Sequence, residues 1–255
     1  MMRGGRRQGH GFTLIEMMLA LVAGLIVSAA ALSFFLSSMK SNGEYVQSTR
    51  LTQELRNSLD LITRDLRRAG YDEKALGYLA TGSASGLTHI CRTTGGSNTC
   101  ITNGSVGDCI IYAYDSGDAS AVDGQVDPDY GEVRGIRRKT DTINGVANTG
   151  IIEYAVSRSG FTKPACGDAK ANYTSFPPSC NGVWCPLSDP TRLNVTSLTF
   201  TDVGGAAGQV LVRNIDVVLQ AQLAGSATFT RGVKTSVRIR SDCFDATLTN
   251  CNSPP

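Results

Sequence analysis

The chain has 255 residues, of which 41% are hydrophobic, with 24 basic and 22 acidic residues and a formal net charge of +2. This near-neutral balance excludes binding to nucleic acid through bulk attraction to phosphate. Only two histidines are present, and His89 is the one beyond the first eleven residues, so there is little support for acid–base or nucleophilic catalysis. We therefore predict a protein that is not an enzyme, needs no cofactor and binds no nucleic acid.

Residues 1–11 form a short polar leader that contains Arg3, Arg6 and Arg7 and no acidic residue. Positive charge before an apolar segment holds that end in the cytoplasm, so the segment enters the membrane with its carboxyl end outward. Removal of the leader leaves 21 of the 24 basic residues against the 22 acidic ones. We expect the bulk of the chain to be exported.

Residues 12–39 are predicted to form a transmembrane helix. No charge occurs in residues 17–39, and a helix over that run would extend about 35 Å. A bilayer core about 30 Å thick requires about 20 predominantly apolar residues. Glu16 is the one charged residue of this segment, and an ionised side chain within hydrocarbon costs several kcal/mol. Glu16 is therefore a functional candidate that needs a partner.

Other interpretations of this segment compete with a retained helix. An ordinary signal peptide would use residues 28–31 as a small-residue cleavage site and would release a periplasmic adhesin or enzyme. That interpretation, like a plain uncleaved anchor, leaves Glu16 unexplained, because a carboxylate at the start of the apolar region hinders insertion. For Glu16 itself, the alternative is a side chain that snorkels to the lipid headgroups.

Residues 40–69 are predicted to continue the helix as an amphipathic half. Five apolar residues recur at spacings of four, four, three and four, which places them on one helix face: Leu51, Leu55, Leu59, Ile62 and Leu66. The other faces carry oppositely charged pairs spaced four apart, such as Arg50 with Glu54. Gly43 weakens the helix by about 1 kcal/mol relative to alanine and is a candidate kink. Gly70 is expected to end the helix.

Residues 70–255 are predicted to form a head of short antiparallel strands. Five segments rich in β-branched and aromatic residues indicate strands, at 109–114, 151–156, 193–201, 210–223 and 228–240. The last two are predicted to pair across a turn at 224–226. Long polar stretches at 81–104, 115–131 and 162–190 are predicted loops. The expected fold class is α+β, a long amino-terminal helix followed by a disulfide-tied antiparallel β head.

Eight cysteines lie in the predicted head, and their even number indicates disulfides formed in an oxidising compartment. They are Cys91, Cys100, Cys109, Cys166, Cys180, Cys185, Cys243 and Cys251. Their connectivity is open, but a bridge between the last two is favoured because it would close the tail. Local bridges are expected within the first three and within the next three cysteines. Since each group has three members, one bridge should join the two groups.

Metal sites and a basic patch are further functional candidates. No Cys-x-x-Cys pair is present, which argues against zinc, and the aspartate-rich stretch at 115–129 lacks the order of an EF-hand calcium loop. No metal site is therefore predicted. The local basic patch is interpreted as a solvated sheet face rather than a phosphate site; it consists of Arg134, Arg137, Arg138 and Lys139.

The run Gly11-Phe12-Thr13-Leu14-Ile15-Glu16, between a basic leader and an apolar helix, resembles the type IV prepilin signature. The resemblance implies that a prepilin peptidase cleaves between Gly11 and Phe12 on the cytoplasmic side. It also implies N-methylation of the new Phe12 amine, so the apolar segment stays on the mature protein. Glu16 would then be a docking residue whose carboxylate pairs with the Phe12 amine of a neighbouring subunit.

Residues 55–71 and the closing Val-Arg-Ile-Arg strand at 237–240 resemble the PilW class of minor pilins. This resemblance implies a single-pass protein of the bacterial inner membrane with a cytoplasmic amino terminus and a periplasmic head, which later enters an extracellular pilus. Its implied partners are other minor pilins, the major pilin and the inner-membrane assembly platform. The implied role is to prime, and at the tip to cap, the filament. The class is similar to the J-type minor pseudopilin of type II secretion, which stays open as an alternative.

Overall fold

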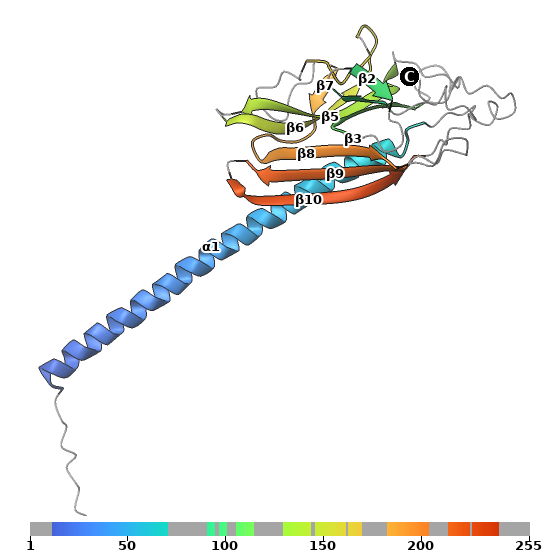
Figure 1. The fold of residues 1–255 in the computed structure, drawn as a ribbon. Helices are drawn as coiled ribbons and strands as arrows, with labels where there is room; N and C mark the ends of the chain where they lie inside the picture. The colour runs from blue at the N-terminus through green and yellow to red at the C-terminus, as the bar shows by residue number, and fades with distance from the viewer. Residues whose placement is uncertain are drawn as a thin grey trace, which may run out of the picture. The chain divides into compact units, whose positions relative to one another are not determined.

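The computed structural model describes residues 12–70, 91–94, 97–100, 106–114, 130–143, 146–161, 163–169, 183–203, 214–224 and 226–239. The chain divides into two compact units, residues 1–49 and 50–255. It has one long helix and two antiparallel sheets, so the predicted α+β, pilin-like fold class is confirmed (Figure 1). The leader with Gly11 lies outside the described residues, as do His89, the stretch 115–129, Cys180, Cys243 and Cys251.

Helix α1 extends from Leu14 to Leu66 and passes through Gly43 without a break. Gly43 therefore does not interrupt the helix. The helix ends slightly before the predicted end at residue 69, because residues 67–70 form a turn. Gly70 adopts a left-handed conformation with φ of 74°, as expected for a residue that follows a helix. Its N–H donates to the carbonyl oxygen of Ala113 at 2.8 Å, which fastens the end of the turn to a strand.

The strands form a six-stranded sheet and a four-stranded sheet, here called sheet A and sheet B. Sheet A has the order β2-β1-β4-β5-β6-β7 and sheet B the order β10-β9-β8-β3, and all neighbours are antiparallel. The strands of sheet A are β1 Cys91–Thr94, β2 Ser97–Cys100, β4 Cys109–Ala113, β5 Val133–Ile143, β6 Val146–Val156 and β7 Trp184–Pro186. Those of sheet B are β3 Val106–Gly107, β8 Leu193–Asp202, β9 Asn214–Leu223 and β10 Ser226–Arg238.

The five predicted strands correspond to β4, β6, β8, β9 and β10, and the predicted pairing of β9 with β10 is confirmed. Residues 210–213 of the predicted fourth strand lie outside the described residues. The loop predictions were wrong where β1 and β2 occupy part of 81–104 and where β7 occupies part of 162–190. These strands are short or polar, and they are held by pairing with neighbours rather than by an apolar pattern of their own.

The main core lies between the carboxyl-terminal part of α1 and both sheets. The five apolar residues predicted on one helix face are all buried, which confirms that prediction. They share one core cluster with residues from sheet A, such as Ile110 and Ile152, and from sheet B, such as Phe200 and Val217. Burial of one such side chain is worth about 1.5–3 kcal/mol, so this helix face is a major source of stability. The ion pair of Glu54 in the described residues is with Arg192, at 3.9 Å, rather than with Arg50.

Sheet A is buried on both faces. All five residues of β4 are buried, and they alternate between the two sides. Ile110 and Tyr112 belong to the main core, whereas Cys109, Ile111 and Ala113 belong to a second core on the outer face. This second core also contains Trp184 and Cys166. A sheet covered on both faces explains why β4 is a nearly continuous apolar run rather than an alternating one.

The two sheets approach each other closely at Gly150 of β6. A Cβ atom at this position would lie 1.8 Å from the carbonyl oxygen of Val195 in β8, so a side chain cannot fit. The Gly150 N–H donates to Oδ1 of Asn194 at 2.8 Å, and Nε of Arg138 donates to the Val195 oxygen at 2.7 Å. A bulge in β8 lies between Val195 and Ser197 at this contact. The glycine therefore fixes how strands β6 and β8 meet.

We expect Gly150→Ala to destabilise the head by about 3 kcal/mol or more, because the added methyl group meets backbone that cannot move alone. The measurement is denaturant unfolding of the purified chain in detergent, followed by the fluorescence of its single tryptophan, Trp184. Gly232→Ala is the matched control, since its Cβ would lie 3.3 Å from the exposed side chain of Gln220 and an ordinary 3.8 Å from the carbonyl oxygen of Leu219. The control should be neutral or slightly stabilising. Equal unfolding midpoints for the two variants would contradict the close approach.

Candidate functional site

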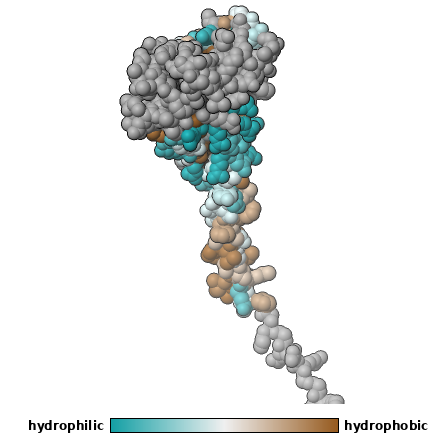
Figure 2. Space-filling model, turned by 90° about the vertical axis from the view of Figure 1, so that its right-hand side faces the viewer, coloured by the Kyte–Doolittle hydropathy of each residue, from teal (hydrophilic) through white to brown (hydrophobic). Residues whose placement is uncertain are grey.

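The amino-terminal part of α1 exposes a largely apolar surface. Every residue from Phe12 to Gln47 is exposed, and an 18-residue window of the helix has a mean hydropathy of 2.5. Figure 2 shows that apolar colour predominates along this part of the helix. The helix is long and apolar enough to cross a membrane. An exposed apolar surface of this extent marks a site of contact with lipid or with other proteins.

The predicted docking residues lie at the start of α1, where Thr13 caps the helix. The Glu16 N–H donates to Oγ1 of Thr13 at 3.3 Å, and the Glu16 and Met17 N–H groups donate to the Thr13 carbonyl oxygen at 3.1 Å. Glu16 thus lies in the first turn, where a negative charge is favoured by the helix dipole. Among the described residues, no ion pair or hydrogen bond involves its carboxylate. The Phe12 side chain is 84% exposed.

A second constellation lies on the outer face of sheet A and is built on a buried ion pair. Arg137 of β5 and Glu153 of β6 are directly opposite in register, and their side chains are 1% and 0% exposed. Nε and Nη2 of Arg137 are 2.8 Å and 2.7 Å from Oε2 of Glu153. The prediction that Arg137 lies on a solvated sheet face was therefore wrong. The reason is that residues 163–169 cover this part of the face, which local sequence does not reveal.

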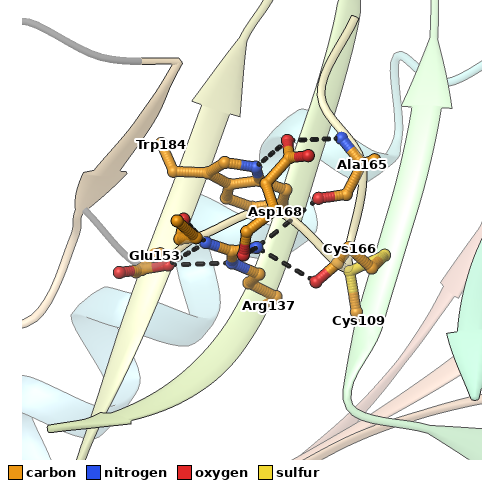
Figure 3. Close-up of a disulfide and its surroundings, with 8 residues drawn as sticks. Cys109, Arg137, Glu153, Ala165, Cys166, Asp168 and Trp184 are labelled. Carbon is orange, nitrogen blue, oxygen red and sulfur yellow. Dashed lines mark hydrogen bonds and ion pairs between the residues drawn. A yellow bond between two sulfur atoms is a disulfide. The ribbon is translucent and has the colours of Figure 1, made fainter. Parts of the chain in front are cut away.

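The other donors of Arg137 hold the covering segment 163–169 through its backbone. Nη1 donates to the carbonyl oxygens of Cys166 and Asp168 at 3.0 Å and 2.9 Å, and Nη2 donates to that of Ala169 at 2.8 Å. A disulfide between Cys109 and Cys166 ties the same segment to β4 (Figure 3). One guanidinium therefore connects two strands to a segment about thirty residues further along the chain.

Trp184 completes this constellation by covering the guanidinium. The guanidinium carbon of Arg137 lies 3.9 Å from the centroid of the Trp184 ring, and Nε1 of Trp184 donates to Oδ2 of Asp168 at 2.9 Å (Figure 3). Gly135 makes room for the indole, since a Cβ there would lie 2.7 Å from Trp184 Cη2. Stacking on an aromatic ring stabilises a desolvated cation by about 2 kcal/mol. The sequence signal for the Arg137–Glu153 pair was Glu153 itself, a charged residue within the apolar run 151–156 that needs a counter-charge when buried.

The Cys109–Cys166 bridge joins the two cysteine groups, as one bridge was expected to do. Cys109 and Cys166 are therefore the members of the two groups that form no local bridge. Cys185 is also disulfide-bonded, and none of the cysteines in the described part of the chain is free. Cys91 and Cys100 are opposite each other in the register of β1 and β2. Directly opposed antiparallel residues have Cα separations that a disulfide can close, so a local bridge there stays a prediction.

A third cluster fastens the end of α1 to β4. The Tyr112 hydroxyl donates to Oδ2 of Asp65, and the Tyr114 hydroxyl donates to Oδ1 at 3.4 Å. Nη1 of Arg134 lies 3.5 Å from the same Oδ1, and its guanidinium carbon lies 4.7 Å from the Tyr114 ring centroid. Burial, with the charge of Asp65 and its hydrogen bond, raises the pKa of Tyr112 well above its usual value. Burial also raises the pKa of Tyr114, with a further contribution from Asp65.

None of these clusters has the composition of a metal or catalytic centre. In the residues that the structure describes, no group of three or more histidine, cysteine, aspartate or glutamate side chains could hold a metal ion. Within each of the two head clusters, the polar side chains form hydrogen bonds or ion pairs inside the head. Their arrangement joins strands, the helix end and a covering segment, so they act as fastenings of the fold. The apolar surface of α1 is the part of the molecule that requires a partner.

Two family models match the chain. The model of Prepilin peptidase-dependent protein B matches residues 44–239, and that of the Prokaryotic N-terminal methylation motif matches residues 6–32. Neither the curated proteins nor the solved structures gave a match.

The methylation motif, the long apolar helix and the β head define a pilin-like protein that depends on prepilin peptidase. The chain belongs to the prepilin peptidase-dependent protein B family. The predicted prepilin signature is confirmed, whereas the PilW class stays a prediction. Families of the pilin type are structural and not catalytic, and their members require a prepilin peptidase and other pilus subunits as partners.

We expect Arg137→Ala to destabilise the head by about 3–5 kcal/mol, because it leaves Glu153 buried without its counter-charge. The measurement is denaturant unfolding followed by far-ultraviolet circular dichroism. Arg192→Ala is the control, since Arg192 is exposed and pairs with Glu54 and Asp189 at 3.9 Å and 3.3 Å. An exposed pair is worth about 0–1 kcal/mol. Similar losses in the two variants would contradict the structural role of the buried pair.

The raised pKa of Tyr112 predicts a loss of stability at alkaline pH. In the unfolded chain tyrosine ionises near pH 10, whereas folded Tyr112 keeps its proton to higher pH. Its contribution to stability is therefore complete below about pH 10 and falls by about 1.4 kcal/mol per pH unit as pH rises towards the folded pKa. Unfolding midpoints measured from pH 8 upward should fall less steeply in Tyr112→Phe. An unchanged slope in Tyr112→Phe would refute the prediction.

Proposed function

We propose that this chain is a minor pilin of a type IV pilus, of the PilW class, that primes filament assembly and caps the filament tip. The observation that carries the proposal is the exposed apolar helix, which begins inside a methylation motif and contains one unpaired carboxylate near its start. Such a helix is suited to reside first in the inner membrane and then among the helices of other subunits. The protein acts by assembly and performs no covalent chemistry itself.

The first step is processing by prepilin peptidase on the cytoplasmic side. Cleavage between Gly11 and Phe12 removes the basic leader, and methylation of the new Phe12 amine leaves a positively charged terminus. The match of the methylation motif to residues 6–32 supports this step, because it includes both residues of the bond. The cut keeps the whole of α1 on the mature protein. The head would then lie in the periplasm, with the processed terminus on the cytoplasmic side.

The second step is pairing of Glu16 with the Phe12 amine of a neighbouring subunit. When apolar helices pack together, the Glu16 carboxylate leaves the region of lipid headgroups and needs a counter-charge. Removing one partner from a buried ion pair costs about 3–5 kcal/mol, so the pair favours the axial register in which both charges meet. The absence of a carboxylate partner for Glu16 within the described residues supports an intermolecular partner.

The head supplies the contacts that distinguish this subunit from others. Its buried ion pair and its disulfide fix the outer face of sheet A. The disulfide would persist after export, because disulfides are stable in an oxidising compartment. The proposed partners are other minor pilins, the major pilin and the inner-membrane assembly platform. The family name does not separate a pilus from a type II secretion system, so the J-type pseudopilin remains the alternative. Loss of surface pili in a strain that lacks this chain, with secretion intact, would favour the pilus.

Glu16→Ala is expected to lower incorporation of this chain into sheared pili by about a hundredfold or more, since 3 kcal/mol corresponds to that factor. Glu16→Gln should be equally defective, because glutamine keeps the size and polarity of the side chain but carries no charge. Glu44→Gln, an exposed position on the same helix, is the matched control and should assemble normally. The measurement is immunoblotting of pilus and membrane fractions.

The Gln variant separates three roles of Glu16. If Glu16→Gln assembles normally and Glu16→Ala does not, a polar side chain is sufficient at this position and the docking proposal fails. If both assemble normally, the carboxylate only snorkels to the headgroups and the docking proposal also fails. All variants must be present in equal amounts in the membrane fraction. A variant that is then missing from pili has a defect in assembly rather than in expression or insertion.

A further inference from the structure

The carboxyl-terminal end of α1 and the β6 side of sheet A enclose a groove of about 180 Å³. Its apolar lining includes Leu61 of α1, Tyr154 of β6 and Leu187 just after β7. Leu61 is 48% exposed and Tyr154 is 38% exposed, so the apolar lining is open to a partner. Sites for small-molecule ligands usually measure about 300–1,000 Å³. The smaller groove therefore suits one inserted side chain.

The charges around this groove are mainly positive. Arg64 and Arg68 lie on its helix side and are exposed. In the part of the chain that the structure describes, neither of them forms an ion pair with an acidic residue. Arg68 has a hydrogen bond with Tyr114, which raises its pKa. The acidic residue of the lining, Asp65, is already engaged by Tyr112, Tyr114 and Arg134.

We propose that this groove docks a segment of a neighbouring pilin-like subunit that places a carboxylate beside an apolar side chain. The apolar side chain would enter between Leu61, Tyr154 and Leu187, and the carboxylate would meet Arg64 and Arg68. An arginine presents a planar fork of donors that fits a carboxylate, so the partner is acidic rather than neutral. This proposal rests on the proposed function, since it names the surface through which the head contacts another subunit.

The test uses the full chain expressed with its native neighbours in the membrane. A photoreactive benzoylphenylalanine replaces Tyr154 in the groove, or Tyr45 on the exposed part of α1 in a parallel strain. Mass spectrometry then identifies the cross-linked peptides. We expect the Tyr154 probe to attach to a peptide of another pilin-like subunit that contains Asp or Glu. Attachment to residues of its own chain, such as 71–90, to lipid, or to a protein of another kind would overturn the proposal, as would the absence of any product.

Charge variants test the role of the two arginines. Arg64→Glu with Arg68→Glu should lower the cross-link yield at the Tyr154 probe about tenfold. The matched pair Arg50→Glu with Arg56→Glu, on exposed positions of α1 away from the groove, should leave the yield unchanged. Arg64→Lys with Arg68→Lys should retain most of it, and unfolding midpoints show that all variants fold. An equal loss in both Glu pairs would overturn the proposal.

The Tyr45 probe separates failure of this inference from failure of the proposed function. Capture of pilin subunits at Tyr45 without capture at Tyr154 would refute the groove and leave the minor pilin intact. Failure of both probes to capture any pilin subunit would refute both. Once the acidic residue of the partner is known, its replacement by lysine should restore cross-linking to the chain with Arg64→Glu and Arg68→Glu.

Discussion

Helix α1 has apolar residues in both its amino-terminal and its carboxyl-terminal part. The sheets of the head bury only those of the carboxyl-terminal part. Leu51, Leu55 and the apolar positions that follow them share one core with both sheets, whereas every residue from Phe12 to Gln47 is exposed. The hydrophobic effect makes such an exposed surface unfavourable in water. The molecule therefore needs a membrane or the helices of other subunits around its amino-terminal part. The proposed membrane anchoring and assembly would both satisfy this constraint.

The head is organised so that the buried part of α1 is held from several directions. Asp65 binds Tyr112 and Tyr114, and Gly70 donates to Ala113, so the helix end is fastened to β4. On the other face of the same sheet, Arg137 and the Cys109–Cys166 bridge secure the covering segment. β4 thus lies between two sets of polar fastenings. This arrangement gives a stable head without a catalytic or metal centre among the residues that the structure describes.

Sequence patterns were sufficient for features that depend on neighbours along the chain. The spacing of Leu51, Leu55 and Leu59 predicted the buried helix face, and the β-branched run before Tyr114 predicted β4. Sequence patterns did not predict the burial of Arg137, because that burial depends on a segment about thirty residues away. They also missed β5, because its arginines and lysine obscure the apolar alternation. The roles of Phe12 and Glu16 depend on a second molecule, so no pattern or contact within one chain decides them.

The account depends most directly on retention of the exposed helix in the mature protein. Mass spectrometry of the amino terminus, on protein purified from membranes and from sheared pili, measures this. The account predicts a chain that begins at N-methylated Phe12 and includes all of α1. A mature terminus near Ala31 or Leu32, as signal peptidase would produce, would remove Glu16 with most of the apolar surface and contradict the account.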